Sequence, residues 1–192
     1  MEANSTDAGK TSRQYDEAAK ECREIFLKKA ADYGTAWHIL RPPSLTDQIY
    51  IKANRIRNIE EKKTKKIEEG VKPEYIGIVN YSIMALIQLN RHPDEPLSTE
   101  ESIQRYDKYL EQAKDLMEKK NHDYGEAWRN MRLSSLTDII LMKLMRIKQI
   151  EDNDGKTLIS EGLEANYYDI INYAMFALIK LNEKNKENTS TD

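Results

Sequence analysis

The chain has 192 residues, a formal net charge of −3 and 33% charged residues. Hydrophobic residues make up 39%, with only 7 Gly and 5 Pro, a composition typical of a soluble helical protein. The slightly acidic balance excludes the global basic field that recruits polymeric nucleic acid. The single cysteine excludes an intrachain disulfide, and no apolar run reaches the roughly 20 residues of a membrane span. Because the first residues lack the apolar core of a signal peptide, we expect a cytoplasmic protein with no membrane partner.

A motif in the first half of the chain returns in the second half. The stretch ADYGTAWHILRPPSLTDQIYIKANRI at 31–56 matches HDYGEAWRNMRLSSLTDIILMKLMRI at 122–147, 91 positions later. From Glu69 onward the offset is 92, so that Tyr75 corresponds to Tyr167. Such constant offsets indicate a tandem duplication, and one unit alone would bury too little surface to be stable.

We therefore expect an all-α fold in which two three-helix units form one six-helix bundle with pseudo-twofold symmetry. The first unit, at 11–92, is called repeat 1, and the second, at 93–184, repeat 2. The polar ends at 1–10 and 185–192 are expected to be disordered tails.

The three helices of each repeat are expected in the same order. The first begins at a capping box and ends at Asp-Tyr-Gly, where glycine can adopt a positive φ. A short segment carrying Ala and Trp follows, and then a second helix that opens at another capping box. Nothing alternates with period two, so no sheet is expected. The expected capping boxes lie at 11–14, 98–101, 44–47 and 135–138, and the third helices cover about 74–91 and 164–184.

A lysine lies in the middle of the apolar stripe of both second helices. Lys52 and Lys143 share a helical face with isoleucines, and a buried ammonium group is costly unless it is paired. Either the amine reaches solvent at the end of an apolar stem, or it meets a carboxylate, such as Asp123 or Asp169, or a phosphate. Three residues further on, Arg55 or Arg146 could hold the same anion.

Aromatic and amide side chains accompany these cations in repeat 2. The third-helix face that carries Asn172 and Tyr173 lines either a cleft or the contact between the repeats. Tyr124 could stack on a base while Arg132 or Lys143 holds a phosphate. For the two tryptophans we favour a hydrophobic role at the helix junctions.

The second helix of repeat 2 is apolar on almost every side, because Leu141, Leu144 and Met145 flank its main stripe. A helix of this kind must be covered all round. We therefore expect it to be central in the bundle or covered by a second chain, which leaves a homodimer open.

The repeated series Asp-Tyr-Gly…Trp…Arg…Lys-x-x-Arg-Ile…Asn-Tyr resembles the nucleotide modification associated domain 1 family, over about residues 13–183 and in both repeats. The resemblance implies a role around modified nucleotides and defines no catalytic residue. With the cationic pairs, it favours a protein that binds a nucleotide or a similar phosphorylated small molecule, without a cofactor. The expected ligand-binding residues are Lys143, Arg146, Tyr124, Arg132, Asn172, Tyr173, Lys52 and Arg55.

More distantly, YYDIINYAMFAL at 167–178 is similar to the Asp-bearing helix of the all-α nucleoside triphosphate pyrophosphatases. That likeness implies an alternative, hydrolysis with Mg²⁺ held by Asp169 and Glu161. The chain departs from the pattern, with Asn166 at the place of a glutamate and Lys143 and Arg146 where that superfamily has Glu-x-x-Glu. A third interpretation is a scaffold in which the repeated cations form only internal salt bridges.

Overall fold

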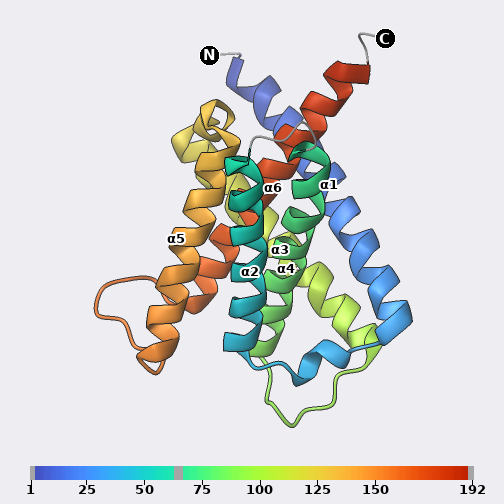
Figure 1. Cartoon of the computed structure of the whole chain (residues 1–192), viewed down its shortest axis with the longest axis vertical. Helices are drawn as coiled ribbons and strands as arrows, with labels where there is room; N and C mark the ends of the chain where they lie inside the picture. Colours follow the sequence, from blue (N-terminus) through green and yellow to red (C-terminus); the bar gives the residue numbers. More distant parts are fainter. Residues whose placement is uncertain (1–2, 63–66, 190–192) are drawn as a thin grey trace.

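The structure, a computed structural model, describes residues 3–62 and 67–189, and all of its regular structure is helical. Each repeat contributes three α-helices and one short 3-10 helix, which confirms the all-α tandem bundle (Figure 1). Within these ranges no strand occurs, and no helix is both long and apolar enough to cross a membrane. The elements are α1 (Ala3–Tyr33), η1 (Ala36–Ile39), α2 (Pro42–Glu61), α3 (Ile67–Leu89), α4 (Thr99–Tyr124), η2 (Ala127–Asn130), α5 (Leu133–Asp152) and α6 (Leu163–Thr189).

The repeats are interlocked by hydrogen bonds that each gives to the other. The hydroxyl of Tyr15 on α1 donates to Asn172 Oδ1 on α6 at 2.9 Å, and that of Tyr106 on α4 donates to Asn80 Oδ1 on α3 at 2.7 Å. Each asparagine also donates to a backbone carbonyl of the first helix of its own repeat: Asn80 to Cys22 on α1, and Asn172 to Ala113 on α4. All four side chains are buried, so the pseudo-twofold relation is built into the core.

A second exchanged set joins α2 and α5 to the opposite third helices. The Thr46 hydroxyl lies 2.6 Å from the Tyr167 hydroxyl, and Tyr75 and Thr137 form the equivalent pair at 2.6 Å. Each threonine also donates to a glutamate of the opposite repeat, Glu151 or Glu60. Burial raises the pKa of both carboxyl groups, and the hydroxyl donors only partly oppose it.

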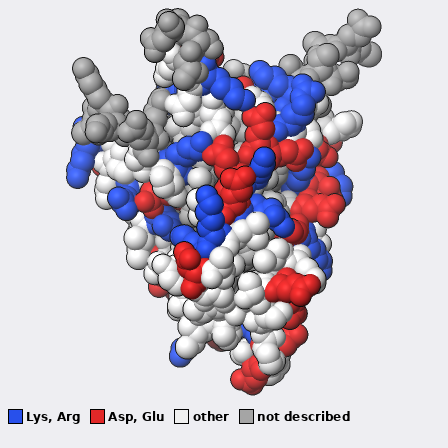
Figure 2. Space-filling view, turned by 90° about the vertical axis from the view of Figure 1, so that its right-hand side faces the viewer, with Lys and Arg blue, Asp and Glu red and all other residues white. Residues whose placement is uncertain are grey.

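Ion pairs repeat the exchange at the surface between α1 and α4. Arg23 binds Asp107 through two nitrogens, and Lys114 binds Asp16 at 2.7 Å. Basic and acidic groups are interspersed on the face shown in Figure 2, so this side carries no field of one sign. Such exposed pairs contribute little stability, and they fix the register of the two helices more than they hold them together.

The expected helix starts were wrong in three places. Thr11 is buried inside α1, and its hydroxyl contacts Glu126 and Arg129 instead of capping a helix. α2 and α5 begin at Pro42 and Leu133, two residues before the expected caps. Proline at the first helical position needs no hydrogen-bond partner, and the equivalent backbone turn forms in α5. The capping box of α4 is confirmed at one end, since Ser98 Oγ accepts from the Glu101 amide at 3.1 Å.

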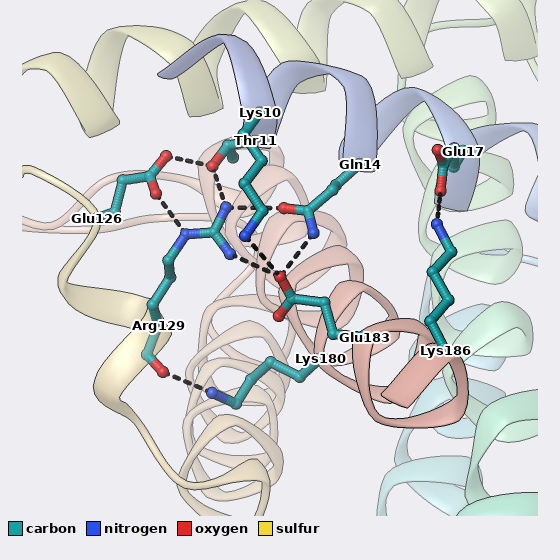
Figure 3. Close-up of polar contacts among 9 residues, drawn as sticks. All are labelled: Lys10, Thr11, Gln14, Glu17, Glu126, Arg129, Lys180, Glu183 and Lys186. Atoms are coloured by element: carbon teal, nitrogen blue, oxygen red, sulfur yellow. Dashed lines mark hydrogen bonds and ion pairs between the residues drawn. The ribbon is translucent and has the colours of Figure 1, made fainter. Parts of the chain in front are cut away.

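The tails were expected to be disordered, but α1 covers 3–10 and α6 covers 185–189. The two helix ends support each other: Lys186 pairs with Glu17 at 2.9 Å, and Lys10 with Glu183 at 3.4 Å (Figure 3). Composition alone cannot show that two polar ends meet in space. The parts of these predictions at 1–2 and 190–192 lie outside the described residues.

The exchanged tyrosines give a direct test of the shared core. Tyr15→Phe and Tyr106→Phe should each lower the free energy of unfolding by about 1–3 kcal/mol, because each leaves a buried asparagine oxygen without a donor. Urea denaturation followed by circular dichroism measures the change, and pseudo-symmetry predicts similar losses. Tyr33→Phe, on an exposed side chain, serves as the control. Unchanged stability in both buried variants would contradict the interlock.

Candidate functional site

Three charged side chains from three helices meet in repeat 2. Lys143 Nζ on α5 donates to Asp169 Oδ2 on α6 at 2.6 Å, and Lys120 Nζ on α4 donates to Oδ1 at 2.6 Å. The Lys143 and Asp169 side chains are 13% and 10% exposed. Burial opposes ionisation of Asp169, yet the two ammonium groups outweigh it and lower the pKa of the carboxyl group.

The lysine on the apolar stripe of α5 therefore points inward and is paired. Its partner is Asp169, whereas Asp123, the other expected carboxylate, is exposed beside His122. The spacing of three residues between Lys143 and Arg146 along α5 does not determine which carboxylate Lys143 binds. Lys143 and Asp169 lie on neighbouring antiparallel helices, and only the packing of α5 on α6 aligns them.

Repeat 1 arranges the same cations around a carboxylate one helical turn away. Lys52 Nζ lies 3.4 Å from Glu74 Oε2, and Arg55 Nη1 lies 3.1 Å from Glu74 Oε1. The counterpart of Asp169 is Gly77, and the Lys52 stem fills the space beside it. A Cβ on Gly77 would lie 2.6 Å from Lys52 Cε, so this lysine conformation requires glycine.

Because the carboxylate of repeat 2 stands at a different position of the third helix, it does not pair with the arginine of that repeat. Asn166 stands where repeat 1 has Glu74, and its amide donates to the backbone oxygens of Gly162 and Glu161. Arg146, the counterpart of Arg55, is exposed and has no ion-pair partner within the described residues. A guanidinium group without a carboxylate is available for an anion from solution.

Arg146 faces a cleft of about 760 Å³ between α5, the start of α6 and the connecting segment 153–162. This segment projects from the bundle between α5 and α6 (Figure 1), and Asp154 and Gly155 take positive φ values of 53° and 76° as it turns. The lining is rich in polar groups: it includes Lys143, Arg146, Gln149, Asn153, Lys156, Thr157, Ser160, Glu161 and Asn166.

A second hollow of about 480 Å³ adjoins the same cluster and is lined by Lys120, Glu161 and Asp169, among others. The two residues expected to hold Mg²⁺ under the hydrolase alternative thus line one pocket. Both Asp169 oxygens, however, already accept hydrogen bonds from ammonium groups. Among the described residues, no group of three or more side chains has the donor set of a metal site.

The other expected ligand-binding residues are dispersed. Asn172 is buried and holds the α1 and α4 contacts, so it faces the contact between the repeats and not a cleft. Tyr173 is half-buried, with its ring 6.3 Å from that of Phe176. Tyr124 is 78% exposed at the end of α4, and Arg132 is exposed at the start of α5. The structure brings neither of these two residues into the lining of the cleft.

The packing role favoured for tryptophan holds clearly in repeat 2. Trp128 is 4% exposed and stacks on Phe176 at 4.3 Å with an angle of 5° between the rings. The Arg129 guanidinium lies 4.4 Å from the Trp128 ring centroid. Figure 3 shows how Arg129 is held in turn by Glu126, Thr11, Gln14 and Glu183.

Three features of the site were missed by the sequence interpretation. Lys120 was not among the expected site residues, although Lys29 repeats it at the matching position. Lys156 and the segment around it have no counterpart of similar sequence in repeat 1. The Arg129 network joins residues more than 100 positions apart in sequence, which no local pattern can indicate.

The expectation that α5 is covered on every side is wrong within this chain. Leu141 and Leu144 are buried, but Met142 and Met145 are 44% and 49% exposed. α5 packs against α2 and α6 and leaves its outer face open. Coverage by a second chain stays a prediction.

Lys143→Met tests the buried pair. Removing this ammonium group leaves a buried carboxylate with one partner, so the melting temperature should fall. The loss of unfolding free energy should reach at most the roughly 3–5 kcal/mol of a broken buried pair. Lys52→Met is the matched control and should cost less, because its contact with Glu74 is 3.4 Å long, against 2.6 Å between Lys143 and Asp169. Equal and negligible shifts in both variants would instead mean that the lysines only lie along apolar surface.

Asp169 gives a pH test with a defined sign. Its pKa is lower in the folded than in the unfolded protein, so its stabilising effect is present above the unfolded value of about 3.9 and is lost as pH falls below it. The difference in unfolding free energy between wild type and Asp169→Asn should therefore be largest near pH 7 and shrink towards pH 3. Urea titrations at five pH values measure it, and a pH-independent difference would contradict the pairing.

Comparison with family models places both repeats in one group. The model described as nucleotide modification associated domain 1 matches residues 29–89 and again 120–181. These ranges contain Lys52, Lys143 and Asp169, the centre of the site in each repeat. Searches of curated proteins and of solved structures find no match, so the pyrophosphatase likeness gains no support from them. The chain belongs to the nucleotide modification associated domain 1 family, with the domain present twice.

Proposed function

We propose that the cleft of repeat 2 binds the phosphate groups of a nucleotide, in connection with nucleotide modification. The observation that carries the proposal is the difference between the repeats at one helical position. Glu74 closes the cationic pair of repeat 1, whereas Asn166 leaves Arg146 open towards the cleft. Repeat 1 therefore shows the same cationic pair with its charges neutralised by a carboxylate of the chain, and repeat 2 can be compared with it.

The charge of the lining favours an anionic ligand. Lys143, Arg146 and Lys156 line the cleft together with one carboxylate, Glu161. Lys143 is partly neutralised by Asp169, so Arg146 and Lys156 are the main phosphate-binding groups. Arginine presents several N–H donors in a plane and can bind two phosphate oxygens at once.

The segment from Thr157 to Ser160 closes one side of the cleft, and its first and last residues offer hydroxyl groups. Leu158 and Ile159 within it are 101% and 99% exposed, so both side chains are free to cover a ligand. Such large exposed apolar side chains often mark a binding surface. The volume of about 760 Å³ lies within the usual range of small-molecule sites.

Arg146→Gln is the decisive variant. It should weaken binding of a nucleoside triphosphate by about 10- to 150-fold, the equivalent of losing roughly 1.5–3 kcal/mol from a hydrogen bond to a charged group. Isothermal titration calorimetry with ATP and dTTP, with and without Mg²⁺, measures the affinity. Arg55→Gln, at the matching position of repeat 1, should leave it unchanged.

Equal affinity of wild type and Arg146→Gln for every nucleotide tested would refute the proposal. The same samples, analysed by chromatography, decide the enzymatic alternative. Release of nucleoside monophosphate that depends on Mg²⁺ and disappears in Asp169→Asn and Glu161→Gln would favour the hydrolase. Lack of binding together with lack of turnover would leave the scaffold interpretation.

A further inference from the structure

Repeat 1 holds an aromatic pocket that the phosphate cleft does not involve. A cavity of about 430 Å³ opens beside η1, between the end of α1 and the middle of α3. Its lining is mostly apolar, and its aromatic members are Phe26, Tyr33, Trp37 and Tyr81. Lys29 is the only charged side chain in the lining. None of these residues lines the cleft of repeat 2.

The equivalent tryptophan of repeat 2 is stacked on an internal ring. Trp128 packs face to face on Phe176, and Arg129 lies over it. In repeat 1 the counterparts are Met84 and His38, neither of which supplies a stacked ring. Phe26 is in contact with Tyr106 instead, at 4.2 Å, so no ring of the described residues stacks on Trp37. Trp37 is only half-buried as a result.

A second difference between the repeats lies on the third helix, two turns before Met84 in α3 and two turns before Phe176 in α6. In repeat 2, Lys120 binds the Asp169 carboxylate. In repeat 1 the counterparts are Lys29 and Gly77, and Lys29 has no ion pair within the described residues. Lys52 reaches the same region, with Nζ 5.7 Å from the centroid of the Tyr81 ring. Among the described residues, repeat 1 thus has no ring stacked on Trp37 and no carboxylate on Lys29, whereas repeat 2 supplies both for Trp128 and Lys120.

We propose that this pocket binds a nucleoside monophosphate. The base stacks on the part of Trp37 that faces the pocket, and the phosphate lies at Lys29, the charged side chain of the lining. Stacking on an aromatic side chain accepts any base, because every base has a π-face.

This second site is independent of the cleft and goes beyond the proposed function. It rests on the open face of Trp37 and the unpaired Lys29, and not on Arg146. Loss of one site by substitution therefore leaves the other available for measurement.

Trp37 fluorescence measures binding at this pocket. Trp128→Phe provides a background in which Trp37 is the only tryptophan, and it removes an indole N–H that is buried without a partner. AMP should quench the emission of this protein. Met84→Phe copies the residue of repeat 2 into repeat 1, fills the place of the base, and should weaken AMP binding at least tenfold. Lys29→Gln should weaken AMP binding several-fold and leave the weaker binding of adenosine unchanged.

Circular dichroism melts establish that each variant is folded. If Met84→Phe is unfolded, Trp37→Leu replaces it, compared with its parent in an Arg146→Gln background that removes binding in the cleft, with saturation-transfer NMR of the AMP ring protons as the readout. The proposal is overturned if AMP gives no quenching, or if a folded Met84→Phe or Trp37→Leu binds AMP as wild type does. It is also overturned if Met84→Phe converts a self-associating wild type to a monomer in sedimentation, because the ring in the pocket would then belong to a second copy.

Discussion

The fold depends on an exchange of buried hydrogen bonds between its two halves. Each repeat places a tyrosine hydroxyl on the asparagine of the other, at 2.9 and 2.7 Å, and all four side chains are buried. A buried polar group that has lost its hydrogen bonds to water and found no other partner destabilises the folded state. Each asparagine accepts its hydrogen bond from the tyrosine of the other repeat, so the core of each half is completed by the other half.

The same symmetry makes the differences between the repeats informative. The residues of the exchanged hydroxyl contacts, Tyr75 and Tyr167 or Thr46 and Thr137, are the same in both halves. Two of the differences between the repeats concern how a charge or an aromatic face is satisfied. Repeat 1 satisfies its arginine with Glu74 and leaves Trp37 open, whereas repeat 2 satisfies Trp128 with Phe176 and leaves Arg146 open. Each half thus retains one unsatisfied part of what a nucleotide would contact.

The buried cluster around Asp169 also limits what chemistry can be attributed to it. An aspartate held by two ammonium groups keeps its charge, but its oxygens are occupied. Without a rearrangement of Lys120 and Lys143, it serves to orient cations and not to hold a metal ion. The exposed Glu161, shared by the two neighbouring hollows, is free of this constraint.

The sequence by itself determined the all-α class, the duplication and the helix order, and it left open whether the lysine on the apolar stripe points inward. These features follow from periodicity and from a constant offset, both of which are local properties that residues carry wherever the helices lie. Helix starts were less certain, because buried contacts from Thr11 and a backbone turn at Pro42 overrode the capping pattern.

Only the tertiary structure decided which groups meet. The choice of Asp169 over Asp123 as the partner of Lys143, the role of Lys120, and the support of Trp128 by Arg129 all join separate helices. The open face of Trp37 could not be read from one sequence, since Met84 and Phe176 are both ordinary apolar residues at a buried position. Helical periodicity says which side of a helix faces inward, but the packing angle and register of its neighbours decide what it faces.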